Sequence, residues 1–278
     1  MKRLLVCLLL LGVVGCGESD ADKAISDADK AIADAHCNRG GDFFVSGQSD
    51  KAIAEYTEAI RIQPERANAY FMRGAVYSEL GQHDKAIADF TEAIRINPGG
   101  NTAYNSRGYS YYQLGQSDKA IADYTEMIRL VPQFALSYYN RGVAYRELGE
   151  NDKAIADFTE AIRINPNDAK AYNNRGWLFS SVIGLYDCDK AIADYTEAIR
   201  INPNDAKAYN ERGIAYSGKD DDDKAIADYT EAIRINPDFS SAYHNRANVY
   251  GRLGNDVKAD ADKAKAKALG YEPPDEDE

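Results

Sequence analysis

The chain has few of the residues on which catalytic and metal chemistry depends. Its 278 residues include three His, four Cys and one Trp. His36, His83 and His244 lie far apart, and no HExxH motif, metal-spaced Cys pair or glycine-rich phosphate loop is present. The sequence therefore predicts no catalytic residue, no metal, no cofactor and no small-molecule substrate.

Positive charge is also scarce. There are 33 Lys and Arg against 45 Asp and Glu, which gives a formal net charge of −12. A chain of this charge is repelled by a phosphate backbone, so we expect no nucleic-acid partner. Charged residues make up 28% and hydrophobic residues 44% of the chain, as in a soluble, folded protein.

No hydrophobic run is long enough to cross a bilayer. The longest is Leu4–Leu11, which follows Lys2-Arg3 and is typical of a secretion signal. Val13–Cys16 follows shortly after this run and resembles a bacterial lipobox. This resemblance implies a signal peptide at 1–15 and lipidation of Cys16, which would partner the chain with a membrane. An ordinary signal peptide with a chance Cys is the alternative.

The residue after the lipobox indicates a location. Gly17 follows Cys16 where Asp would favour retention at the inner membrane of enteric bacteria. By this analogy we expect a lipid-anchored protein of the cell envelope, at the outer membrane and facing the periplasm.

A repeated stretch dominates the rest of the chain. Asp189–Pro203, DKAIADYTEAIRINP, recurs identically at Asp223–Pro237, and further copies follow at an offset of 34 residues almost throughout. Between copies lies a second motif, AYxxRGxxY, as in Ala208–Tyr216. A period of this length predicts a solenoid whose units bury their apolar faces against their neighbours.

Each unit contains two helices. In the unit 67–100, Tyr70, Gly74 and Tyr77 share one stripe of a first helix, and Gly81 gives the turn that ends it. A second helix starts at Asp84 and stops before Pro98. We expect Ala86, Phe90, Ala93 and Ile94 to face inward, and Lys85, Asp89, Glu92 and Arg95 to face solvent.

This pattern resembles the tetratricopeptide repeat (TPR) family. The aromatic, Gly, aromatic, Ala, aromatic, Ala and Pro residues fall at unit positions 4, 8, 11, 20, 24, 27 and 32. The resemblance implies an all-α fold, a right-handed α-solenoid of about seven helix-turn-helix units. We expect a polar helical spacer at 16–32, an acidic tail at 274–278, and between them a solenoid over 33–273. Its units are 33–66, 67–100, 101–134, 135–168, 169–205, 206–239 and 240–273.

Position 7 departs from the family, because it is Arg in every unit where Leu is usual. We expect these side chains to pack between helices while their guanidinium groups reach neighbouring acids. Cys37 and Cys188 are four units apart, beyond disulfide distance, and should be free thiols, with Cys188 the more exposed. The run Asp220–Lys224 should be solvated acid at a helix start.

Surplus aromatic residues suggest where a ligand binds. In the family, first-helix positions 2, 5, 9, 12 and 13 line a concave groove, and their spacing puts them on one helix face. Four large aromatics that the repeat pattern does not require fall on these positions: Tyr109, Tyr112, Tyr139 and Trp177. Phe71 falls there too. Aromatic anchors are the usual energetic centre of an interface, although some of these rings could instead fill contacts between repeats.

Polar residues complete the predicted groove. Lys170, Asn173, Lys207 and Asn210 lie at positions 2 and 5 and could hydrogen-bond a ligand. The family's carboxylate-clamp pattern is matched only in part, because Glu211 stands where a cation is required. We expect a non-catalytic scaffold that binds a peptide or protein segment in the groove. The alternative is a lipoprotein that binds cell-wall glycan.

Overall fold

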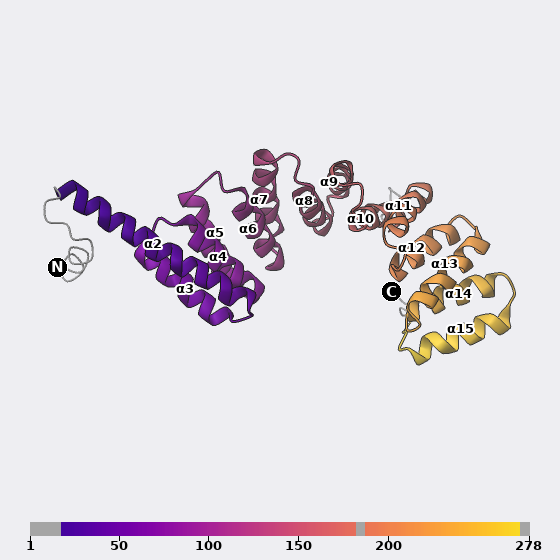
Figure 1. Ribbon diagram of the computed structural model, residues 1–278. Helices are drawn as coiled ribbons and strands as arrows, with labels where there is room; N and C mark the ends of the chain where they lie inside the picture. The colour runs from indigo at the N-terminus through magenta and orange to yellow at the C-terminus, as the bar shows by residue number, and fades with distance from the viewer. Residues whose placement is uncertain (1–17, 182–186, 273–278) are drawn as a thin grey trace. The chain divides into compact units, whose positions relative to one another are not determined.

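The computed structural model describes residues 18–181 and 187–272 (Figure 1). Every regular element in these residues is an α-helix. The first six helices are α2 (Glu18–Val45), α3 (Ser49–Ile62), α4 (Ala67–Glu79), α5 (His83–Ile96), α6 (Asn101–Gln113) and α7 (Ser117–Leu130). The other eight are α8 (Ala135–Glu147), α9 (Asn151–Ile164), α10 (Ala169–Ser181), α11 (Cys188–Ile201), α12 (Ala206–Ser217), α13 (Asp222–Ile235), α14 (Ser240–Arg252) and α15 (Asp256–Ala268). The all-α prediction is confirmed.

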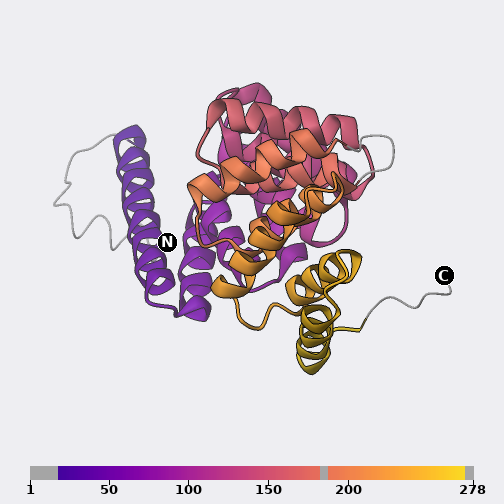
Figure 2. The same cartoon turned by 90° about the vertical axis from the view of Figure 1, so that its right-hand side faces the viewer.

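The helices form hairpins that stack on one another. The chain divides into two compact units, residues 1–132 and 133–278. The first contains the hairpins α2–α3, α4–α5 and α6–α7, and the second contains α8–α9, α10–α11, α12–α13 and α14–α15. Within each unit the second helix of one hairpin packs against the first helix of the next. Figure 2 shows this stacking in the orange and yellow hairpins that end the chain. These are the helix-turn-helix repeats of a solenoid.

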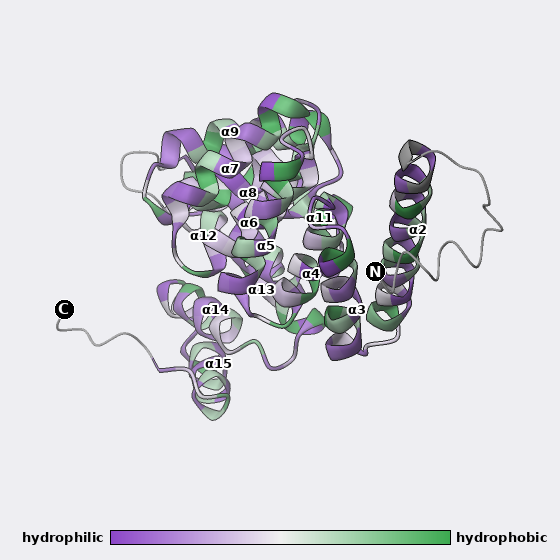
Figure 3. Ribbon diagram, turned by 90° about the vertical axis from the view of Figure 1, so that its left-hand side faces the viewer, coloured by the Kyte–Doolittle hydropathy of each residue, from purple (hydrophilic) through white to green (hydrophobic). Residues whose placement is uncertain are grey.

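Sequence signals fix the ends of the helices. Asp84, Asp118, Asp152 and Asp189 lie in first turns, where a negative charge suits the helix dipole. Five of the described turns between paired helices have Gly in the left-handed region, as at Gly81 with φ +70°. Asp220 occupies this turn position in the sixth repeat with φ 58°, the one non-Gly residue with positive φ in the described chain. Polar and apolar residues alternate around the helices (Figure 3).

The core of each of the first six repeats is an aromatic ring packed against a glycine. Tyr56, Phe90, Tyr124, Phe158, Tyr195 and Tyr229 at position 24 are at most 2% exposed. A Cβ atom added to Gly213 would lie 2.7 Å from Cε1 of Tyr229, so only glycine allows this approach. In the last repeat the ring is replaced by Lys263, and the facing position carries Ala247 instead of Gly.

The position-7 arginines bind acids, as predicted, but the acid partner is buried. Nε and Nη2 of Arg73 each donate to a carboxylate oxygen of Asp89 at 2.8 Å, and Nη1 donates to Oγ1 of Thr57 in the preceding repeat at 2.9 Å. Asp89 is only 6% exposed, so its predicted exposure was wrong. A buried aspartate is stable as an ion only with such a partner. We call each of these arginine–aspartate pairs a staple. The same two-oxygen pairing holds for Arg107–Asp123, Arg141–Asp157, Arg175–Asp194, Arg212–Asp228 and Arg246–Asp262.

Three other expectations have structural outcomes. Cys188 is 8% exposed, like Cys37, because it begins α11 against the core; both thiols are free, but Cys188 is not the exposed one. α2 runs without a break across 32/33, so the spacer and the first helix of the first repeat are one helix. In the acidic run, Asp222 and Asp223 lie in the first turn of α13, as expected.

No helix among residues 18–181 and 187–272 combines the length and the apolar character that crossing a membrane requires.

Candidate functional site

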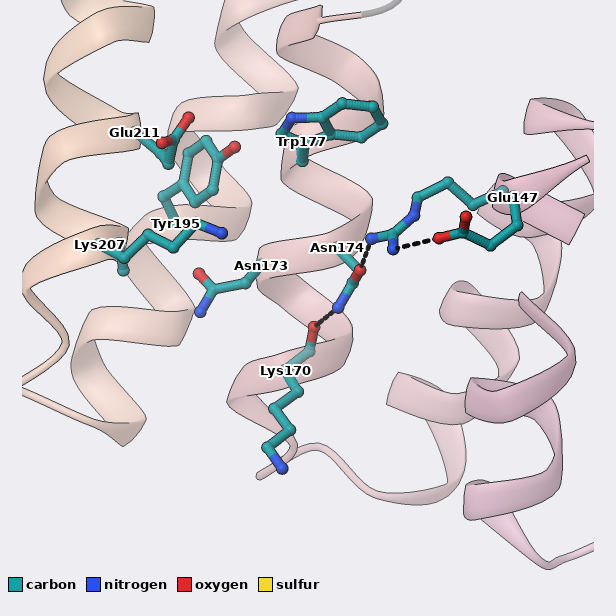
Figure 4. Close-up of a pocket in the computed structure, with 10 residues that line it drawn as sticks. Glu147, Lys170, Asn173, Asn174, Trp177, Tyr195, Lys207 and Glu211 are labelled. Carbon is teal, nitrogen blue, oxygen red and sulfur yellow. Dashed lines mark hydrogen bonds and ion pairs between the residues drawn. The ribbon is translucent and has the colours of Figure 1, made fainter. Parts of the chain in front are cut away.

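A cavity of about 550 Å³ opens on the first helices of three consecutive repeats in the second unit (Figure 4). α8 contributes Arg146 and Glu147, and α10 contributes Lys170, Asn173, Asn174 and Trp177. The remaining lining residues are Tyr195 from α11 and Lys207, Ala208 and Glu211 from α12. Four of the nine predicted groove residues, Lys170, Asn173, Trp177 and Lys207, therefore line one cavity.

The repeat geometry explains this convergence. Lys170, Asn173 and Trp177 are three or four residues apart on α10, so they share one face of that helix. Lys207 occupies on α12 the position that Lys170 occupies on α10. The staples Arg175–Asp194 and Arg212–Asp228 fix each of these helices to the second helix of its hairpin. The cavity is thus built on rigid elements.

Trp177 is the main apolar surface of the cavity. Its side chain is 40% exposed although it is the largest in the chain. The guanidinium carbon of Arg146 lies 5.7 Å from the centre of its ring, within cation–π distance. Arg146 is held there by Oδ1 of Asn174 and by Oε1 of Glu147, the latter at 3.2 Å from Nη2. Arg146 thus packs on the ring of Trp177 while its positive charge is paired with Glu147.

Glu211 is the unusual charge of the cavity. Desolvation by burial raises the pKa of its carboxyl, and the Asn210 amide and the positive charge of Lys207 oppose this shift. Nδ2 of Asn210 donates to Oε1 of Glu211 at 3.4 Å, which is a long bond. In the described part of the chain, Glu211 has no cationic partner within 4 Å. The cavity therefore contains a largely buried acid without a counter-ion.

Asn173 also has an unsatisfied group. Its Nδ2 donates to Oδ2 of Asp205 at 2.9 Å, and Asp205 in turn caps α12 by accepting from the backbone N–H of Ala208. Its Oδ1 is buried and has no hydrogen-bond partner among the residues that the structure describes. A buried acceptor without a donor costs free energy, so Asn173 adds an unsatisfied polar group to the wall of the cavity.

Two predicted groove residues of this unit are engaged elsewhere. Asn210 is 3% exposed, and its Oδ1 accepts from Nδ2 of Asn245 at 3.0 Å in the next repeat. Tyr139 packs on Phe158, with ring centres 5.8 Å apart, and its hydroxyl accepts from Nδ2 of Asn174 at 3.3 Å. Asn210 and Tyr139 therefore support the neighbouring structure and do not line the cavity.

The first unit contains the other predicted aromatics. Phe71 packs on Phe90, with ring centres 5.7 Å apart, and lines a separate cavity of about 150 Å³. Tyr109 is 44% exposed and meets His83 edge-on at 6.2 Å. Tyr112 is half-buried. Tyr109 is thus the most exposed of the three predicted aromatic residues in this unit.

The chemistry of the larger cavity is that of recognition. It offers an aromatic face, amide groups and charges of both signs, but no nucleophile paired with a base. Within 18–181 and 187–272, no group of three or more His, Cys, Asp or Glu side chains could hold a metal ion. Of the lining residues, Arg146 and Glu147 lie at predicted groove positions 12 and 13 but were not singled out. Their charge on the predicted helix face was the available signal.

Comparison with known families agrees with this geometry. Models of the tetratricopeptide repeat match residues 67–99, 135–168, 206–239 and 228–261, and a further TPR repeat model matches 42–81, 108–149 and 187–220. The stacked helix hairpins define a helical repeat protein. The chain belongs to the tetratricopeptide repeat family.

Solved structures share the fold. A MamA structure is 26% identical with a TM-score of 0.56, over 60% of this chain and 96% of that one. A tetratricopeptide repeat protein from Parabacteroides merdae is 21% identical with a TM-score of 0.64, over 87% of this chain and 94% of that one. YrrB, described as a TPR protein with an unusual peptide-binding site, is 24% identical with a TM-score of 0.59, over 68% and 96%. No curated protein sequence matches this chain.

Proposed function

We propose that this protein is a non-catalytic scaffold that binds a peptide or protein segment on the first helices of its second unit. The observation that carries this proposal is the cavity in which Lys170, Asn173, Trp177 and Lys207 come together. An aromatic residue surrounded by polar groups on rigid helices is the usual centre of a protein interface. The staple arginines are bound to aspartates within their own repeats and do not line the cavity, so the residues that do line it are the ones that a ligand would contact.

Trp177 gives the direct test. Because its ring is 40% exposed, Trp177→Ala should change the free energy of unfolding by less than about 1 kcal/mol. If the ring is an anchor, the same change should weaken binding of an affinity-captured partner by about 2 kcal/mol or more. Calorimetric titration and urea unfolding measure the two quantities.

A buried ring provides the control for this test. Phe158 is 0% exposed, so Phe158→Ala should cost roughly 3–5 kcal/mol of stability. A Trp177→Ala variant that unfolds as easily as Phe158→Ala, yet binds normally when folded, would mean that Trp177 is packing. Retention of the chain by isolated peptidoglycan without any protein partner would instead support the glycan-binding alternative.

We further propose that the scaffold is a lipoprotein of the bacterial envelope, anchored through Cys16 at the outer membrane and facing the periplasm. The support is the sequence Val13–Cys16 after a short apolar run, in residues that lie outside the described structure. Several acyl chains, each stabilised by about 0.8 kcal/mol per buried methylene, would hold it firmly.

Lipid labelling tests this second proposal. Cys16→Ser should abolish incorporation of labelled fatty acid and release the protein from the membrane fraction. Cys37→Ser is the matched control, because Cys37 is buried in the first repeat and should leave labelling unchanged. Equal labelling of the Cys16→Ser variant and the parent would rule out the anchor.

A further inference from the structure

Within the described chain, the large cavity contains an acid without a counter-ion and an amide oxygen without a hydrogen-bond partner. Glu211 brings a carboxylate that no Lys or Arg of the described chain approaches within 4 Å, and Asn173 brings a buried Oδ1 without a partner. Both residues line the same cavity, from the facing helices α12 and α10, as Figure 4 shows. Elsewhere this chain pairs every buried position-23 acid with an arginine, for example Asp228 with Arg212. The cavity thus lacks the cation that the rest of the fold supplies.

The cations near the cavity do not fill this role. Arg146 is bound to Asn174 and Glu147 and lies over Trp177. Lys170 and Lys207 are exposed and form no ion pair in the part of the chain that the structure describes. In their exposed positions the ammonium groups of Lys170 and Lys207 keep their hydration. Moving either group into the cavity would remove that hydration, and the carboxylate of Glu211 would have to compensate for the loss. The exposed lysines therefore leave the site open to a cation from outside.

We propose that the cavity binds the side chain of a lysine or arginine from an extended peptide partner, with the cation at Glu211 and the aliphatic stem beside Trp177. This inference rests on the proposed function and deepens it, since it names the chemistry of the bound segment. A basic side chain supplies the cation that Glu211 lacks, and its methylene stem suits an aromatic surface. A peptide carboxylate is disfavoured at this point, because Glu211 would repel it.

The exposed lysines add a second feature of the partner. Lys170 and Lys207 lie at the edge of the cavity and would repel further cations. The segment that fits is therefore one basic residue with acidic or neutral neighbours. A polybasic segment is excluded by the same charges.

A synthetic peptide library tests the inference. The probe is a library of bead-bound decapeptides, acetylated and amidated so that neither terminus carries a charge. It is screened with the full-length chain, and beads are kept when Trp177→Ala abolishes binding. We expect one Lys or Arg in the selected peptides, with acidic or neutral flanks. Replacing that residue by norleucine should weaken binding at least about tenfold, the effect of losing a charge-assisted hydrogen bond.

Glu211 variants complete the test. Glu211→Gln preserves the shape of the side chain and should lose the same factor of about ten for the basic peptide but not for its norleucine form. Glu79→Gln, at an exposed acid of the first unit, should bind like the parent. A thermal melt of each variant verifies that it is folded.

Each other outcome overturns a distinct claim. Trp177-dependent peptides without an enriched basic residue, or basic peptides that bind Glu211→Gln as well as the parent, overturn the inference and leave the scaffold function standing. A library in which no bead depends on Trp177 overturns both the inference and the proposed peptide-binding function.

Discussion

Glu211 is a cavity acid whose burial makes its ionised form costly to the free protein. The side chain lies next to Tyr195 and Tyr229, whose own pKa values are raised by burial and partly by the charge of Glu211. Both phenols thus stay neutral where Glu211 titrates. The positive charge of Lys207, one turn earlier on α12, acts in the other direction. Ionised Glu211 is therefore a cost to the free protein that a bound cation would remove.

This cost should appear as a pH dependence of stability. Burial places the pKa of Glu211 above its ordinary value of about 4.5, so the folded state binds this proton more tightly than the unfolded state. The contribution of Glu211 to stability should fall as pH rises from about 4.5 through the raised pKa, and then level off. Urea unfolding of the parent and Glu211→Gln across this range measures the difference, because all other carboxyl groups cancel. A difference that does not vary with pH would contradict the assigned burial.

Single residues were predicted with unequal success, for physical reasons. Trp177 was singled out because the repeat pattern does not require it, and helical spacing places it on one face of α10 with Lys170; the structure shows that both line the cavity. Asn210 lies on that face too, but a contact with Asn245 in the next repeat buries it, and such a contact does not follow from spacing. Asp89 was misjudged because its partner Arg73 lies 16 residues away on another helix. The recurrence of the Arg and Asp positions together in the sequence was the signal for their pairing.

Pairs of helices approach closely because a glycine faces a ring. Gly213 on α12 and Tyr229 on α13 show the tightest such contact in the second unit, since a Cβ atom at Gly213 would lie only 2.7 Å from the ring. Gly251 on α14 is the same residue type, but a Cβ atom there would meet no atom within 4 Å. The two positions separate the packing effect of glycine from its effect on the helix itself.

Alanine substitutions at these two sites should change stability in opposite directions. Gly213→Ala should lower the free energy of unfolding by about 1–3 kcal/mol, because Tyr229 must move. Gly251→Ala should raise it by up to about 1 kcal/mol, because alanine favours the helix and nothing obstructs it. Urea unfolding measures both. If the two variants shift stability equally, the ring contact is not what selects glycine.

Helix boundaries were predictable where local chemistry sets them. The Asn-Pro pair after α5 and the left-handed Gly81 before it are local signals, and the structure ends the helices there. The continuity of α2 through 32/33 was missed, because no local signal marks the boundary that we expected between the spacer and the first repeat. That helix lacks an internal Gly or Pro stop before Gly40, and Gly40-Gly41 remain helical because Tyr56 packs on Gly40.

At the scale of the whole chain, each stack needs a covered end. In the second unit α15 provides it: Ala259 and Ala266 face inward, while Val257 and the lysines of the last turn face outward. α14 inserts Val249 next to Tyr229 and Ala225 of the preceding hairpin. The hairpin α14–α15 thus shields the apolar surface of α12 and α13.

Removing this cap should destabilise the protein. Truncation after Pro237 exposes Tyr229 and Ala225, so we expect a melting temperature lower by more than about 5 °C and association at micromolar concentration. Thermal melts and analytical ultracentrifugation measure the two effects. Truncation after Tyr271 is the control, because it keeps α15. A shorter chain that is as stable and as monomeric as the parent would show that α14–α15 is no cap.

The arginine staples have a consequence for how such a gene changes. Each staple arginine binds an aspartate in its own repeat. Arg212, for example, binds Asp228 and also donates to Thr196 in the preceding repeat, so its hydrogen bonds span at most two adjacent repeats. Where three extra residues separate Arg175 from Asp194, the bond has the usual lengths of 2.9 and 2.7 Å. If one whole repeat is duplicated or deleted, each repeat that remains therefore still contains both the arginine and the aspartate of its staple. Since Asp189–Pro203 and Asp223–Pro237 are identical, unequal recombination can alter the number of repeats while each product keeps a complete set of bonds.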